Sequence, residues 1–208
     1  MRKALTSASL RAAFTRVDLD GRAAQAAMAP SRRGTPPDRA RREAPRDAAA
    51  LAYVFEQGGR LRLPFTVRSR HLPEHRGQVS LPGGRPLAEE SLFETARREA
   101  REEIALAVPA PELVGRLAPV SIPVSHSRLH VFVTLGPDPG TLVPDPREVE
   151  RIVVVDLDDL VRPEVRRERP MTIAGVEIAV PYYDVEGLFL WGATAMAIAE
   201  LVERLRRV

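Results

Sequence analysis

Three closely spaced glutamates, Glu99, Glu102 and Glu103, are the side chains in this sequence whose type and spacing most clearly suit chemistry. On a helix with about 100° per residue, Glu103 lies about 40° to one side of Glu99 and Glu102 about 60° to the other, so the three carboxylates share one edge. Like charges at such positions repel by roughly 0.2–0.5 kcal/mol per pair, which suggests a missing cation. Carboxylate ligands without Cys or clustered His favour Mg²⁺ or Mn²⁺ over zinc.

The residues around these glutamates form a longer pattern. Gly84 ends a Pro-Gly-Gly turn, Glu90 stands six residues later, and the run REAREEIAL occupies residues 98–106. An isolated Arg- and Glu-rich helix would usually be a solvated face, but these fixed offsets behind a Pro-Gly-Gly turn are far more specific. The pattern resembles the Nudix box, with Ala105 standing where the box has its last Gly.

This resemblance implies roles for the residues of the box. The implied metal ligands are Glu99, Glu102, Glu103 and the carbonyl of Gly84. The general base would be Glu102 or Glu103, since the sequence alone gives neither geometry nor pKa. Arg98 belongs to the same catalytic group, where it would pair with Glu90 and fix the helix against its loop.

The stretch before the box narrows the resemblance to one subfamily. Residues 66–84, TVRSRHLPEHRGQVSLPGG, resemble the motif that precedes the box in coenzyme A pyrophosphatases, and WGATA at residues 191–195 resembles a second motif of these enzymes. Pro73 replaces an Arg of the motif and Leu81 replaces a Phe. The resemblance covers roughly residues 48–205. It implies substrate-binding roles for Arg68, Ser69 and Gly83.

Three further residues are candidates for the site. Glu148 matches a Glu that the subfamily tends to have before a strand, where it would reach the metal cluster or only hold its loop. His75 stands where the subfamily often has His, on the substrate side. His126 lies in a downstream region that supplies the base in some Nudix enzymes. Each histidine could equally be structural or exposed.

The implied reaction is metal-dependent hydrolysis of the pyrophosphate bond of coenzyme A or acyl-CoA. The products would be 3′,5′-ADP and 4′-phosphopantetheine or its acyl form. One alternative is a Nudix pyrophosphatase for another nucleoside diphosphate derivative, such as ADP-ribose, NADH or a dinucleoside polyphosphate, and Pro73 favours it. Another is a non-catalytic Nudix-fold binding domain, which would have no need of three intact glutamates.

The composition limits the other functions that this chain could have. It has 208 residues and no cysteine, which excludes disulfides and thiolate chemistry and fits a reducing cytoplasm. No apolar run approaches the roughly 18–20 residues of a membrane span, so we expect no membrane partner. Residues 1–47 carry 11 Lys and Arg against 5 Asp and Glu, and the remainder is net acidic. We therefore expect a small nucleotide-like substrate and no nucleic acid partner, and a homodimer stays open.

The periodicity of the chain indicates the elements that position these residues. The pattern of residues 1–47 predicts a partly mobile N-terminal extension with two short helices, near 10–16 and 22–28. Residues 48–208 predict the catalytic domain, with hairpins at 48–67 and 172–180 and an amphipathic terminal helix. Periodicity gives an α/β fold, and the resemblance implies an α/β/α sandwich with a mixed β-sheet. Because Ala is disfavoured in the left-handed conformation, we expect the acidic helix to run past Ala105 or to bend without a left-handed residue.

Overall fold

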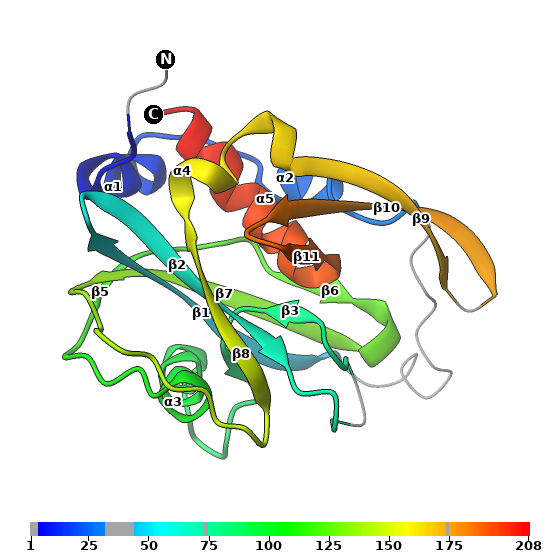
Figure 1. The fold of residues 1–208 in the computed structure, drawn as a ribbon, viewed down its shortest axis with the longest axis horizontal. Helices are drawn as coiled ribbons and strands as arrows, with labels where there is room; N and C mark the ends of the chain where they lie inside the picture. Colours follow the sequence, from blue (N-terminus) through cyan, green and yellow to red (C-terminus); the bar gives the residue numbers. More distant parts are fainter. Residues whose placement is uncertain (1–3, 32–43, 73–74, 174) are drawn as a thin grey trace.

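The computed structural model describes residues 4–31, 44–72, 75–173 and 175–208 (Figure 1). Its central hairpin joins β1 (Arg46–Gln57) to β2 (Arg60–Arg68) through Gly58 and Gly59, which both have positive φ. The first predicted hairpin is therefore confirmed. Glycine suits this turn because it adopts left-handed backbone angles without a steric penalty from a Cβ.

The main sheet extends this hairpin on both sides. Strand β1 pairs in parallel with β7 (Ser127–Gly136), which also pairs antiparallel with β5 (Glu112–Arg116) and β6 (Val120–Ile122). On the other side, β2 pairs antiparallel with β8 (Val149–Asp156). Parallel and antiparallel pairs occur in one sheet, which confirms the predicted mixed sheet.

Away from their turn, β1 and β2 no longer pair with each other, and residues 79–84 lie between them. Cα pairing between the two strands covers only residues 55–57 and 60–62. Farther along, β3 (Val79–Ser80) pairs with β2 and β4 (Gly83–Gly84) pairs with β1. The predicted site loop therefore ends inside the sheet, and its two glycines lie beside the middle of β1.

Helices cover both faces of this sheet (Figure 1). Helix α3 (Leu92–Ile104) lies on one face, where Ala96, Ala100 and Ile104 pack in a core cluster with Leu51 and Tyr53 of β1. Helix α5 (Gly192–Arg206) lies on the other face and contributes to the larger core cluster. This arrangement confirms the predicted α/β/α sandwich.

A second, antiparallel sheet lies at the side of the domain. It consists of β9 (Arg166–Ile173), β10 (Val176–Val185) and β11 (Leu188–Trp191), so the second predicted hairpin is also confirmed. The short helix α4 (Leu157–Leu160) and 3₁₀ turns at 123–125 and 163–165 complete the elements of the described residues. None of the helices in these parts of the chain has the length and hydropathy of a membrane span.

The prediction for the end of the acidic helix is wrong. Helix α3 ends at Ile104, and Ala105 is left-handed, with φ 53° and ψ 36°. The N–H of Leu106 donates to the Ala100 carbonyl at 3.2 Å, and the Leu106 side chain is buried in the core beneath the helix. Burial of a leucine contributes roughly 1.5–3 kcal/mol, which exceeds the cost of about 1 kcal/mol for Ala in this conformation.

The N-terminal segment is packed on the domain over residues 4–31. Both predicted short helices are present, as α1 (Ser7–Thr15) and α2 (Gly21–Ala26). Leu5, Leu10, Ala13 and Met28 are at most 4% exposed and belong to the larger core cluster. This part of the segment is thus not separate from the core, and the division at residue 47 into extension and domain stays a prediction.

Candidate active site

Gly83 and Gly84 bring the backbone of the loop directly against β1 and α3. Gly83 pairs with Ala50, and Gly84 pairs with Ala49. A Cβ on Gly83 would overlap the Ala49 carbonyl oxygen, and a Cβ on Gly84 would overlap the Glu99 carboxylate. At Gly83 any side chain would meet the backbone of β1, and at Gly84 a side chain would displace the carboxylate end of Glu99.

Helix α3 presents its acidic edge toward this turn. Ser91 caps the helix and forms a reciprocal capping box with Glu94, which fixes where the helix begins. The edge continues from Glu99, whose side chain is 14% exposed, to Glu102, which is 57% exposed. Glu103 is buried, with 2% of the residue exposed. The three carboxylates therefore span a range from solvent to the protein interior.

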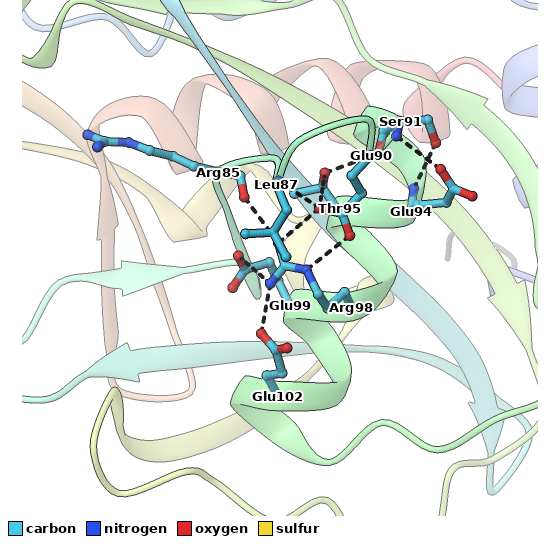
Figure 2. A network of polar contacts seen from close by, with 9 residues as sticks. All are labelled: Arg85, Leu87, Glu90, Ser91, Glu94, Thr95, Arg98, Glu99 and Glu102. Carbon is cyan, nitrogen blue, oxygen red and sulfur yellow. Dashed lines mark hydrogen bonds and ion pairs between the residues drawn. The ribbon is translucent and has the colours of Figure 1, made fainter.

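Arg98 is the centre of a polar network on this edge (Figure 2). Its Nε donates to Glu90 at 3.0 Å, which is the pairing predicted from the sequence. Its Nη1 donates to Glu99 at 2.9 Å and to Glu102 at 2.7 Å, two contacts that sequence reasoning missed. The guanidinium thus supplies positive charge to three carboxylates in the metal-free protein.

The same network fixes the loop before the helix (Figure 2). Arg98 Nη2 donates to the Arg85 carbonyl at 3.0 Å, and the Leu87 N–H donates to Glu90 at 3.1 Å. Thr95 was not singled out from the sequence, although its buried hydroxyl donates to Glu90 at 2.9 Å. Its position five residues after Glu90 on the buried side of α3 is the signal that could have identified it. Hydrogen bonds from Arg98 and Leu87 lower the pKa of Glu90 to about 2.

Glu103 has a different environment, in which Arg68 forms only a long ion pair with it. The Gly83 N–H lies 3.4 Å from one carboxylate oxygen, and Arg68 Nη1 lies 3.8 Å from the other. Burial raises the pKa of Glu103 to about 8, the Arg68 charge opposes this rise, and nearby Glu99 and Glu148 add to it. Burial also raises the pKa of Glu99. A buried carboxylate with little positive charge near it favours the binding of a cation.

The residues fit a divalent metal ion, although they are not yet arranged around one. Within the described residues, no three His, Asp or Glu side chains are close enough to hold an ion together. Arg98 accounts for part of this, since it holds Glu99 and Glu102 while Glu103 turns toward Gly83. Hard carboxylate oxygens, including the buried Glu103 with only a long ion pair to Arg68, match what Mg²⁺ and Mn²⁺ require.

Arg68 and Ser69 lie where β2 leaves the sheet. The Arg68 N–H donates to the Gln78 carbonyl at 2.9 Å and its carbonyl accepts from Gly77 at 3.0 Å, so the loop is closed at its base. Arg68 Nε is buried without a hydrogen-bond partner. Ser69 is 3% exposed, and its hydroxyl oxygen accepts from the His71 N–H at 3.4 Å, a contact that shapes the loop. Substrate contacts of both residues stay predictions.

The three further candidates differ in their surroundings. The Glu148 carbonyl accepts from the Ser69 N–H at 2.8 Å, and its charge raises the pKa of both Glu99 and Glu103, so Glu148 belongs to the acidic group. His75 is exposed, and its Nδ1 lies 3.0 Å from Gln78 Oε1. The His126 carbonyl accepts from Arg46 at the start of β1. The roles of the two histidines stay predictions.

Known proteins resemble this chain in sequence. The model of the NUDIX domain matches residues 45–174. The human protein named mitochondrial coenzyme A diphosphatase NUDT8 is 37% identical over 124 residues, which cover 58% of this chain and 52% of the human protein. An uncharacterized Nudix hydrolase NudL from Yersinia enterocolitica is 36% identical, over 69% of this chain and 73% of its own length. Nudix hydrolase 15, mitochondrial, from Arabidopsis thaliana is 34% identical over 73% of this chain and 55% of the plant protein.

Solved structures resemble the fold at lower sequence identity. The MutT protein from Methanosarcina mazei Go1 has a TM-score of 0.52 at 18% identity, and the match covers 79% of this chain and 96% of that protein. A MutT/nudix family protein from Enterococcus faecalis also has a TM-score of 0.52, at 14% identity, over 99% of this chain and 76% of its own. The NUDIX domain match covers more than half of the chain, so the chain belongs to the Nudix hydrolase family.

Proposed function

We propose that this protein hydrolyses the pyrophosphate bond of coenzyme A or acyl-CoA with the help of Mg²⁺ or Mn²⁺. The products are 3′,5′-ADP and 4′-phosphopantetheine or its acyl form. The observation that carries the proposal is the acidic edge of α3, where Glu99 and Glu103 meet the Gly83-Gly84 turn and Arg68 approaches from β2. A turn of two glycines without side chains gives a pyrophosphate close access to the backbone.

The glutamates of α3 are the proposed metal ligands, with Glu148 next to them. Divalent ions at these carboxylates supply positive charge that offsets the oxygens of the pyrophosphate and helps a water molecule attack. Hydrolysis adds the elements of water across one P–O bond, so one carboxylate must take a proton from the water. Glu102 is open to solvent and Glu103 is buried, and either is retained as the proposed base.

Two arginines have distinct proposed roles in this reaction. Arg98 holds the helix against its loop through Glu90 and the Arg85 carbonyl, so it orients the acidic edge. Arg68 faces the same edge from β2, and its unpartnered Nε can donate to a phosphate oxygen. Gly83 lies in the turn, where its N–H faces the Glu103 carboxylate.

The substrate class rests on similarity as well as on this geometry. Residues 66–84 resemble the motif that precedes the box in coenzyme A pyrophosphatases. One relative, 37% identical over part of both chains, is named a coenzyme A diphosphatase. Both observations support a substrate that carries a pantetheine arm on a nucleoside diphosphate.

A substrate panel tests this proposal. Purified protein is incubated with CoA, acetyl-CoA, ADP-ribose, NADH and Ap4A, each with millimolar Mg²⁺ or Mn²⁺ and again with EDTA. We expect release of 3′,5′-ADP from CoA, abolished by EDTA. A robust enzyme that leaves CoA intact but cleaves ADP-ribose or Ap4A would refute the substrate class. No turnover of any substrate would favour a non-catalytic binding domain.

A further inference from the structure

A second cavity lies far from the acidic edge, where the N-terminal segment meets the domain. It has a volume of about 490 Å³, is open to solvent on one side, and is lined by residues of α2, α5 and the β9–β10 hairpin. Figure 1 shows where these elements lie. Its apolar wall includes Met28 from the N-terminal segment and Ala199 and Val202 from α5. A cavity of this size with a mainly apolar wall can hold a small organic molecule.

Polar groups from three elements converge on this cavity. Tyr183 on β10 and Arg166 on β9 are cross-strand partners, so their side chains lie side by side on one face. Arg206 comes from α5, four residues after Val202 and on the same helical face. All three side chains line the cavity.

Neither arginine has a carboxylate partner among the described residues. Arg166 Nη2 donates to the Ala27 carbonyl at 2.9 Å, and Arg206 Nε donates to the Val161 carbonyl at 2.9 Å. Arg206 Nη2 is buried and has no hydrogen-bond partner. Two guanidinium charges beside one cavity, neither of them paired with a carboxylate, favour a negatively charged ligand.

The acidic residues around the cavity are already engaged. The Asp20 carboxylate accepts from the N–H groups of Arg22 and Ala23 as the cap of α2. Glu203 accepts from Arg207 at 2.9 Å. Their charges are therefore partly satisfied elsewhere, and an excess of positive charge remains with Arg166 and Arg206.

The Tyr183 hydroxyl adds an uncharged donor. The residue is 3% exposed, and its side chain lines the cavity. Burial raises the pKa of Tyr183 to about 12, so the hydroxyl keeps its proton at neutral pH. A protonated phenol beside two guanidinium groups can donate to the same oxyanion.

We propose that this cavity binds an oxyanion, a phosphate or carboxylate, carried on a short hydrocarbon chain. The oxyanion contacts Arg166, Arg206 and Tyr183, and the chain lies against Met28, Ala199 and Val202. Because Met28 follows α2, such a ligand bridges the N-terminal segment and α5 and stabilises their docking. This site is independent of the proposed pyrophosphatase reaction.

Calorimetry with hexyl phosphate and hexanoate, in EDTA, tests the site on the full chain, with hexanol as the uncharged probe. We expect saturable binding of at least one anion with Kd on the order of 1 mM or below, and at least about tenfold weaker binding of hexanol. The anion should also slow hydrogen exchange in α2. Comparison of the two anions identifies the preferred headgroup.

Variants locate the bound anion. Arg166→Gln should weaken binding about tenfold or more, and Tyr183→Phe, which keeps the ring, should weaken it several-fold. Arg167→Gln is the matched control, because Arg167 is exposed on the same strand and pairs with Asp184 instead. Absence of saturable binding would overturn the proposal. Equal losses in Arg166→Gln and Arg167→Gln, or a loss only in Arg68→Gln, would also overturn it.

Discussion

Burial of Glu103 predicts how the stability of the metal-free protein depends on pH. The pKa of Glu103 rises from 4.5 to about 8 in the folded protein, chiefly through burial. A group whose pKa is higher in the folded state stabilises the fold fully below its unfolded pKa, and the stability is lost as pH rises through the folded value. The metal-free protein should therefore lose stability between about pH 4.5 and pH 8, and Glu103→Gln should remove the part of this loss that comes from Glu103.

The magnitude follows from the size of the shift. A change from 4.5 to about 8 corresponds at roughly 1.4 kcal/mol per pKa unit to an upper limit of about 5 kcal/mol. Relaxation of the side chain toward Arg68 and entry of water reduce this value. We expect a loss on the order of 2–4 kcal/mol from this one residue. The raised pKa of Glu99 acts in the same direction, so Glu103→Gln should flatten the profile without abolishing its slope.

Urea denaturation in EDTA at pH 5.0 and pH 8.5 measures this effect. The free energy of unfolding should fall more for the wild type than for Glu103→Gln. Glu102→Gln is the matched control on the same helix, because its side chain is 57% exposed. Its profile should follow that of the wild type, and added Mg²⁺ should restore wild-type stability at pH 8.5. Parallel profiles for the wild type and Glu103→Gln would refute the reasoning from burial.

Three other changes have defined outcomes. Glu102→Gln should reduce the rate of CoA hydrolysis by about 10² or more and change the unfolding free energy by less than about 0.5 kcal/mol, because the pair with Arg98 is largely exposed; an unchanged rate would remove Glu102 from the site. Ala105→Gly should raise the unfolding free energy by about 1 kcal/mol, because Ala105 is left-handed, and lower stability in urea would contradict this account. Removal of residues 1–31 should lower the unfolding free energy by several kcal/mol, since Leu10 and Met28 each contribute roughly 1.5–3 kcal/mol by burial; a truncated chain with an unchanged melting temperature would show that this docking adds no stability.

The sequence predicted the elements that have strong local signals. Helix α3 begins where Ser91 and Glu94 form a capping box, and its apolar side faces the sheet at the expected spacing. Both hairpins turn at glycines with positive φ. The pairing of β4 with β1 was not predicted, because two glycines carry no periodic pattern and their position depends on contacts with Ala49 and Ala50.

The docking of the N-terminal segment has a cause that local patterns do not show. Glu200 on α5 is 1% exposed, accepts from Arg204 at 3.0 Å and from the Ala118 N–H at 2.8 Å, and lies 3.2 Å from Gln25 Nε2. Gly21 has no room for a Cβ, which would overlap the Glu200 carboxylate. A buried carboxylate needs such partners, and three of them lie far from one another in sequence. Residues 1–31 are rich in Ala and Arg, a composition that does not predict burial. Their burial could therefore not be predicted without the position of Glu200.

The spacing of the three glutamates on α3 is weaker evidence for a metal ion than the burial of one of them. Repulsion among three glutamates suggested a missing cation, yet Arg98 already contacts Glu99 and Glu102 at 2.9 and 2.7 Å. These two carboxylates would therefore be compensated even on a helix with no metal site. Glu103 is different, because Arg98 makes no contact with it and its closest cation is Arg68, at 3.8 Å. A carboxylate that is buried beside the Gly83-Gly84 turn with only a long ion pair is the stronger argument for a metal ion. This argument depends on burial, which the spacing of the glutamates alone does not give.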